Sequence, residues 1–148
     1  MFRLLFVTFA LLVSTTQPLL AGPLDEAKAK AHLEAVAAGD LDALMRDYAD
    51  TADLDWIGGP LDGHYHGKAA IGEVWRKFMA ANAANAGKPR PARLGKLSSF
   101  ANPAGTSLEV SAEYGGVTPV KVWHVQVYRD AVLTHEIWQI APAIQLAP

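Results

Sequence analysis

The chain has 148 residues, of which 51% are hydrophobic and 19% charged, and this balance is typical of ordinary globular proteins rather than disordered or fibrous ones. Its formal net charge of −2 and the lack of a basic run exclude the positive surface that nucleic-acid binding requires, so no nucleic-acid partner is expected. The chain has no cysteine, so its stability depends on a hydrophobic core alone.

The first 21 residues differ in composition from the rest of the chain. Arg3 is their only charged residue, and residues 4–13 form an apolar run typical of a secretory signal peptide. We expect residues 1–21 to be removed after Ala21 and residues 22–148 to be exported, to the periplasm or outside the cell. An uncleaved anchor or a buried N-terminal segment are the alternatives. Since a bilayer span needs about 20 apolar residues, no stable span is expected after cleavage.

The first half of the mature chain predicts three helices. Apolar residues recur at helical spacing over residues 24–38, 41–48 and 69–84. Gly39 suits the left-handed position after the first helix, and Asp40 suits the N-cap of the second.

The second half changes to the period of two that strands have. A short strand is expected at residues 51–57, between the second and third helices. The other expected strands are residues 93–100, 107–114, 117–128 and 132–140. Helices followed by hairpin-linked strands predict an α+β domain with the helices packed on one sheet face.

This order of elements, with Tyr-Ala-Asp at residues 48–50 and Gly-Lys-Ala-Ala-Ile at 67–71, resembles the nuclear transport factor 2-like superfamily. The similarity covers nearly all of residues 22–148 and is to its SnoaL-like polyketide cyclases and ketosteroid isomerases. It implies a cone-shaped domain, with three N-terminal helices packed on a strongly curved, mostly antiparallel sheet that encloses a pocket. It does not fix the function, because this fold hosts many chemistries.

The resemblance also points to individual residues. The general-base carboxylate of ketosteroid isomerases falls on Trp56 here. The tyrosine of their first helix falls on His32, and the protonated acid of their oxyanion hole falls on His124. His124 and His32 are therefore the candidate catalytic residues, because both can carry a proton near neutral pH.

Strand alternation predicts the walls of the pocket. If His124 faces inward, Val122 and Gln126 do so too, giving the mostly apolar lining with few polar groups that ligand pockets have. Burial should lower the pKa of such a histidine unless a carboxylate approaches it. Alternatively, His124 and Gln126 only form hydrogen bonds with each other or with the backbone inside a core. The other expected lining residues are Leu54, Trp56, Trp75, Phe78 or Met79, and His135 or Trp138.

Acidic residues offer further candidates for acid–base chemistry. These are Asp53 and Asp55 on the first strand, Asp62 after it and Glu136 on the last strand. Asp53 and Asp55 share one strand face, and we expect that face to be solvated.

Two histidines raise the question of a metal. His64 and His66 alternate in a glycine-bounded loop, so they can point to one side, and His135 or Glu136 could add a ligand. Exposed loop residues explain the same pattern. No cysteine or carboxylate stands beside them at metal-ligand spacing, so no metal and no cofactor are expected.

The outward face of the strand at 117–128 carries Trp123, Val125 and Val127. Such a patch needs cover, and this sheet face commonly forms a dimer in the superfamily, so a homodimer is expected.

Two functions remain open at this stage. The first is an exported protein that binds a small apolar molecule without established catalysis. The second is an isomerase, dehydratase or cyclase in which His124 and His32 transfer a proton on an apolar, cyclic or aromatic substrate. A purely structural or protein-interaction module is a third alternative.

Overall fold

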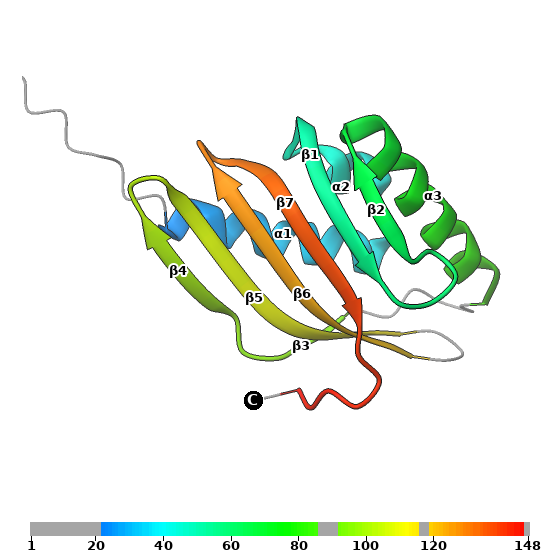
Figure 1. The fold of residues 1–148 in the computed structure, drawn as a ribbon. Helices are drawn as coiled ribbons and strands as arrows, with labels where there is room; N and C mark the ends of the chain where they lie inside the picture. Colours follow the sequence, from blue (N-terminus) through cyan, green and yellow to red (C-terminus); the bar gives the residue numbers. More distant parts are fainter. Residues whose placement is uncertain (1–21, 86–91, 116–118, 147–148) are drawn as a thin grey trace, which may run out of the picture.

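The computed structural model describes residues 22–85, 92–115 and 119–146. The expected signal peptide lies outside these described residues. The helices of the described residues pack along one side of a curved, open sheet (Figure 1). The helices are α1 (Gly22–Ala38), α2 (Leu41–Met45) and α3 (Lys68–Asn85). The α+β class and the N-terminal position of the helices are confirmed.

Seven strands of the described residues form one sheet in the order β2-β1-β7-β6-β5-β3, with β4 also paired to β5. Their bounds are β1 (Tyr48–Ile57), β2 (Gly63–His66), β3 (Arg93–Leu94), β4 (Ser98–Asn102), β5 (Gly105–Tyr114), β6 (Val120–Arg129) and β7 (Val132–Ile140). The pairing of β1 with β7 is parallel, whereas the other described pairings are antiparallel. The sheet is therefore mostly antiparallel, as predicted.

The second helix is shorter than predicted. It ends at Met45, and Tyr48 already begins β1 with its side chain buried. The backbone N–H of Leu133 donates to the carbonyl of Asp47 at 2.7 Å, so the sheet, rather than another helical turn, satisfies this carbonyl.

Two expectations about strands need correction. The segment with His64 and His66 is the edge strand β2 and not a loop, because it pairs with β1 across a turn in which Gly58 and Gly59 have φ of 90° and 76°. The single strand expected at 93–100 is divided into β3 and β4, and both pair with β5.

The turn between β6 and β7 lies one residue later than expected. Asp130 and Ala131 have φ of 50° and 60°, and two successive left-handed residues give the type I′ geometry that matches the twist of a hairpin. Among the described helices, none is both long and apolar enough to cross a membrane.

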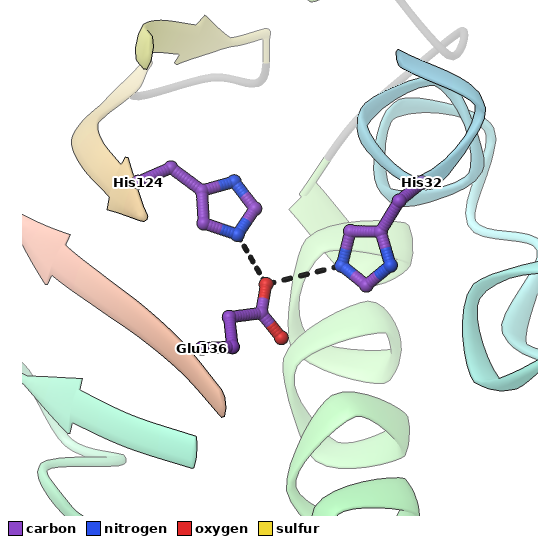
Figure 2. A group of neighbouring side chains, drawn as sticks. All are labelled: His32, His124 and Glu136. Carbon is purple, nitrogen blue, oxygen red and sulfur yellow. Dashed lines mark hydrogen bonds and ion pairs between the residues drawn. The ribbon is translucent and has the colours of Figure 1, made fainter. Parts of the chain in front are cut away.

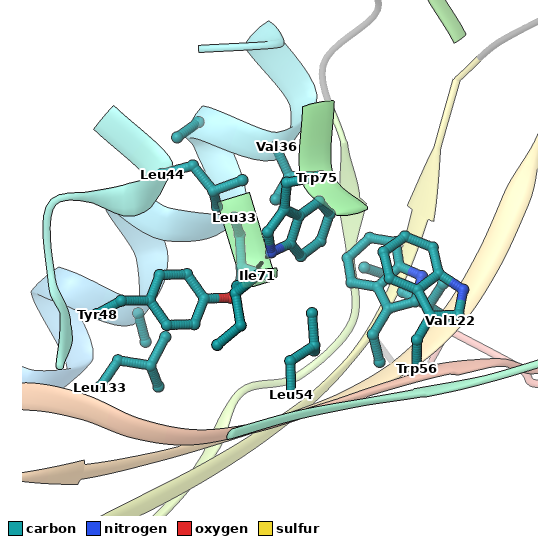
Figure 3. Close-up of a cluster of buried hydrophobic side chains, with 14 of the residues drawn as sticks. Leu33, Val36, Leu44, Tyr48, Leu54, Trp56, Ile71, Trp75, Val122 and Leu133 are labelled. Atoms are coloured by element: carbon teal, nitrogen blue, oxygen red, sulfur yellow. Dashed lines mark hydrogen bonds between the residues drawn. The ribbon is translucent and has the colours of Figure 1, made fainter. Parts of the chain in front are cut away.

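The core lies between the helices and the inner face of the sheet (Figure 3). Along β5 and β6, buried and partly exposed residues alternate strictly over most of their length, as predicted for half-buried strands. The inward residues of β6 include Val122, His124, Gln126 and Tyr128, so the predicted phase of this strand is confirmed. Opposite it, helix α1 contributes Ala29, His32, Leu33 and Val36 to the buried interior.

Candidate functional site

Three elements bring His32, His124 and Glu136 together inside the protein, and we call these residues the buried cluster (Figure 2). His32 projects from α1, His124 from β6 and Glu136 from β7. The side chains of all three are almost completely buried, with 1%, 0% and 0% of their surface exposed. The structure thus brings the two candidate catalytic histidines, His32 and His124, to the same place in the interior.

Both imidazole rings contact the same carboxylate oxygen. His32 Nε2 lies 3.0 Å from Glu136 Oε1, and His124 Nε2 also contacts Glu136 Oε1. With the carboxylate ionised, an Nε2–H of each ring can donate to that oxygen. The ring centroids of the two histidines are 5.7 Å apart, so the carboxylate joins the two rings into one unit.

The other polar atoms of the buried cluster have no hydrogen-bond partner among the described residues. These atoms are Nδ1 of His32, Nδ1 of His124 and Oε2 of Glu136. Gln126, which lies directly opposite Glu136 on β6, accepts from the Tyr128 hydroxyl at 3.3 Å, but its Nε2 is unpaired as well. Buried polar groups are nearly always paired in folded proteins, so a group of unpaired ones points to a bound molecule, water or ion.

Aromatic side chains surround the buried cluster, and they are those predicted as pocket walls. Trp138 is central, with ring centroids 5.2 Å from His124, 5.3 Å from Trp56 and 4.9 Å from Trp75. Phe78 packs on Trp56 at 5.2 Å. Leu54 and Val122 are also buried among the core residues. These walls are in contact with one another, so this part of the interior is packed core.

A hollow of about 320 Å³ lies beside the buried cluster, between α1 and the strands β3 and β5. We call it the α1–β5 hollow, and its lining residues are Glu26, Ala27, Lys30, Leu33, Leu94, Gly95, Leu97 and Val110. Val110 is the direct ladder partner of His124 on the inner sheet face, and Leu33 follows His32 on α1. Two residues of the hollow's lining are therefore neighbours of cluster residues, Leu33 along α1 and Val110 across the sheet.

His135, predicted as one of two alternatives for lining the pocket, lies on the opposite sheet face. The ladder between β6 and β7 shifts at Val127 and Tyr128, so that Leu133 and Glu136, three residues apart, are both buried. This bulge changes the phase of β7, directs Glu136 and Trp138 inward and turns His135 outward. There, His135 Nε2 lies 2.9 Å from Asp55 Oδ2.

The outward face of β2, β1 and β7 carries a second group of titratable side chains, which we call the outer cluster: Asp53, Asp55, His64, His66 and His135. The prediction that both aspartates face away from the core is confirmed. Hydrogen bonds from His66 and His64 lower the pKa of Asp53 and Asp55, respectively, and Asp55 raises the pKa of His64. The groups form a chain of alternating imidazoles and carboxylates that solvent reaches.

The pKa of His124 is lowered well below its ordinary value, because burial disfavours the charged ring and His32 adds repulsion. The unfolded chain then binds a proton below about pH 6.5 that folded His124 does not bind, so His124 contributes stability above that pH that is lost as the pH falls. The expected slope is about 1.4 kcal/mol per pH unit in this range.

Urea unfolding of wild-type protein and His124→Gln between pH 7 and pH 5 measures this effect. The variant should lose the His124 contribution to the slope, whatever its stability at pH 7. Equal slopes in both proteins would show that folded His124 takes up its proton over the same pH range as in the unfolded chain, and would contradict a lowered pKa.

Glu136 is the one residue of the buried cluster that was not among the predicted pocket residues. Its sequence position suggested only an acidic candidate on the last strand and a possible further ligand for His64 and His66. Its place two residues before Trp138, and therefore in the same phase, was the available signal. The general-base position of the ketosteroid isomerases carries Trp56 here, whose side chain is buried and apolar, and the carboxylate of the interior comes from β7 instead.

No protein-family model matches the chain, and no curated protein matches it. Solved structures do match. An NTF2-like protein of unknown function from Pseudomonas putida has a TM-score of 0.62 and 18% identity, over 77% of this chain and 82% of that chain. A ketosteroid isomerase-like protein from Erwinia carotovora atroseptica has a TM-score of 0.61 and 19% identity, over 80% and 95%.

A SnoaL-like protein of unknown function from Burkholderia thailandensis has a TM-score of 0.59 and 18% identity, over 84% of this chain and 99% of that chain. At these identities the matches establish the fold and not the activity. The curved sheet, the N-terminal helices and these structural matches together show that the chain has the fold of the nuclear transport factor 2-like proteins.

Proposed function

We propose that the protein binds a small, largely apolar molecule that carries one polar group. The observation that carries this proposal is the set of unpaired polar atoms at the buried cluster, inside an otherwise apolar interior. Leaving a buried polar group unpaired costs about 1–3 kcal/mol. A ligand group that pairs with several of these atoms would recover much of this cost on binding.

The α1–β5 hollow supports the proposal by supplying largely apolar space, and one of its lining residues, Val110, is the ladder partner of His124. Leu33, Leu97 and Val110 are among its walls, and Lys30 and Glu26 are its charged members. Its volume of about 320 Å³ is at the lower end of the range for ligand sites. The expected ligand is therefore a small ring system or short chain.

The unpaired atoms also indicate whether the polar group of the ligand donates or accepts hydrogen bonds. Gln126 Nε2 and Trp138 Nε1 are donors, whereas Glu136 Oε2 is an acceptor. A hydroxyl group, which donates and accepts, fits this mixture better than a charged group does.

Quenching of tryptophan fluorescence by 2-naphthol tests the proposal, since this probe combines an apolar ring system with one hydroxyl. Wild-type protein should bind it saturably, and Gln126→Leu should weaken binding by about tenfold, the equivalent of one hydrogen bond of about 1.4 kcal/mol. Phe100→Ala, whose side chain on β4 is 63% exposed, is the control and should bind normally. Native mass spectrometry of freshly purified protein should show a retained small molecule. Equal binding by all variants would contradict the proposed site.

A second candidate function is proton transfer in an isomerase, dehydratase or cyclase. It is favoured by the convergence of His32 and His124 on one carboxylate, because three titratable groups within reach of one position satisfy the geometry of acid–base catalysis. Deuterium exchange next to the carbonyl of cyclohexanone, followed by NMR, would test it. Wild-type protein should accelerate the exchange, and Glu136→Gln should not.

We also propose that the protein forms a homodimer through the outer sheet face. Trp123, Val125 and Val127 lie on this face of β6, and Ile137 lies beside Val125 on β7. Trp123→Glu should give monomers in light scattering at micromolar concentration, because an unpaired charge is costly to bury. A wild-type monomer, or a variant that stays dimeric, would contradict this interface.

Export remains part of the proposal, and it is supported by the composition of residues 1–21. N-terminal sequencing of protein from the cell envelope should begin near Gly22. Recovery of intact Met1 from that fraction would contradict cleavage.

A further inference from the structure

We propose that His32, His124 and Glu136 bind one divalent transition-metal ion, with Zn²⁺ as the best match. The inference rests on the cluster used in the proposed function and adds a metal ion as a constituent of that site. Histidine, cysteine, aspartate and glutamate are the residues that commonly bind metal ions. Among the described residues, the buried cluster is the one group of three or more of them whose ligand atoms all lie within 4.8 Å of one another.

The donor set fits this class of metal. Two imidazoles and one carboxylate are the three protein ligands of one well-known class of zinc sites, in which a fourth position stays open for water or substrate. Imidazole nitrogen also suits copper, nickel and iron, whereas Mg²⁺ and Ca²⁺ prefer all-oxygen sites. The ligand set therefore selects a transition metal over the alkaline-earth ions.

The burial of the cluster agrees with this donor set. Exclusion of solvent disfavours a charged imidazole, and the neutral ring is the form that binds a metal ion. The carboxylate of Glu136 lies in a region from which solvent is excluded. A dication at the point where the three ligand atoms meet would compensate its negative charge.

The ligands are also held by rigid elements. β6 and β7 pair along their length, with Gln126 directly opposite Glu136, and α1 is fixed over the sheet by contacts such as Lys28 Nζ to Asp47 Oδ1 at 3.0 Å. Such fixed ligands favour a defined coordination geometry over an adaptable one.

The outer cluster is the obvious competitor for metal ions, because it holds three histidines on an exposed face. This competitor supplies the matched control. In the double variant His64→Ala/His66→Ala, two of its three imidazoles are gone while the buried cluster is unchanged. In Glu136→Gln and His124→Gln, the buried cluster loses a ligand while the outer cluster is unchanged.

ZnCl₂ is added to the native protein in one arm and is present during refolding in the other. Free metal is then removed, and the bound zinc is measured by inductively coupled plasma mass spectrometry. We expect about one zinc per chain in the wild type and in the His64→Ala/His66→Ala variant. Affinity should fall by at least about 100-fold in Glu136→Gln and His124→Gln, since even residues that only orient ligands are worth about 10–100-fold. Circular dichroism checks that these variants fold.

A second measurement does not depend on buried substitutions. Co²⁺ bound at the buried cluster should quench tryptophan fluorescence in the His64→Ala/His66→Ala variant, because Trp138 packs on His124 at 5.2 Å between ring centroids and Trp75 on His32 at 6.3 Å. Absence of zinc from the wild type, loss of zinc in the outer double variant, or absence of this quenching would each overturn the inference. If the protein binds 2-naphthol but not zinc, the metal inference is wrong and the proposed function stands. If it binds zinc but not 2-naphthol, the metal inference stands and the proposed function is wrong.

Discussion

Trp138→Ala is expected to lower the free energy of unfolding by about 3–5 kcal/mol, the range for removing a large aromatic side chain from a core. Trp138 is completely buried. Its ring packs against those of Trp56, Trp75 and Tyr114, with centroids 5.3, 4.9 and 5.1 Å away. One substitution therefore removes a contact shared by β1, α3 and β5, and the loss cannot be repaired by movement of a single element.

Urea unfolding monitored by circular dichroism measures this loss. The control is Phe100→Ala, because the Phe100 side chain on β4 is 63% exposed and its removal should change stability by no more than about 0.5 kcal/mol. Similar losses in the two variants would mean that Trp138 is not a central core residue.

The residues that alternate most regularly allowed the clearest structural predictions. β5 and β6 are long, their inner and outer faces differ in polarity, and their side-chain phase was predicted correctly from period two alone. The third helix was also found within one residue at each end, since Trp75 and its apolar neighbours recur at helical spacing. In such segments one local pattern determines which face is buried.

The remaining features depend on contacts between distant segments. Where the second helix ends, the carbonyl of Asp47 accepts from Leu133 of β7. The strand β2 is defined by its pairing with β1, in which His64 and His66 lie opposite Asp55 and Asp53.

The bulge in β7 leaves no mark in the local alternation, so strand phase counted from Val132 or Leu133 does not place Glu136 and His135 correctly. The spacing of Glu136 from Trp138 is the one local signal for its inward side chain, but which distant residues this carboxylate joins depends on how α1 and β6 pack against β7.

Glu136→Leu is expected to destabilise the protein by about 2–5 kcal/mol, although leucine is apolar and close in size to glutamate. The substitution removes the shared acceptor of His32 and His124 and leaves two buried N–H groups without a partner. Each such group costs about 1–3 kcal/mol. Urea unfolding at pH 7 measures the change, and Glu136→Gln should cost less, because its amide oxygen can still accept from both rings.

The triple variant His32→Leu/His124→Leu/Glu136→Leu shows whether the buried cluster serves stability or binding. Replacing a complete buried charged group by apolar residues of similar volume is often neutral or stabilising by about 1–4 kcal/mol, so the triple variant should be more stable than Glu136→Leu alone. It should also bind neither zinc nor 2-naphthol. A triple variant less stable than Glu136→Leu would mean that the cluster contributes to folding. A Glu136→Leu variant whose free energy of unfolding is within about 0.5 kcal/mol of wild type would mean that the carboxylate is not the acceptor of the two rings.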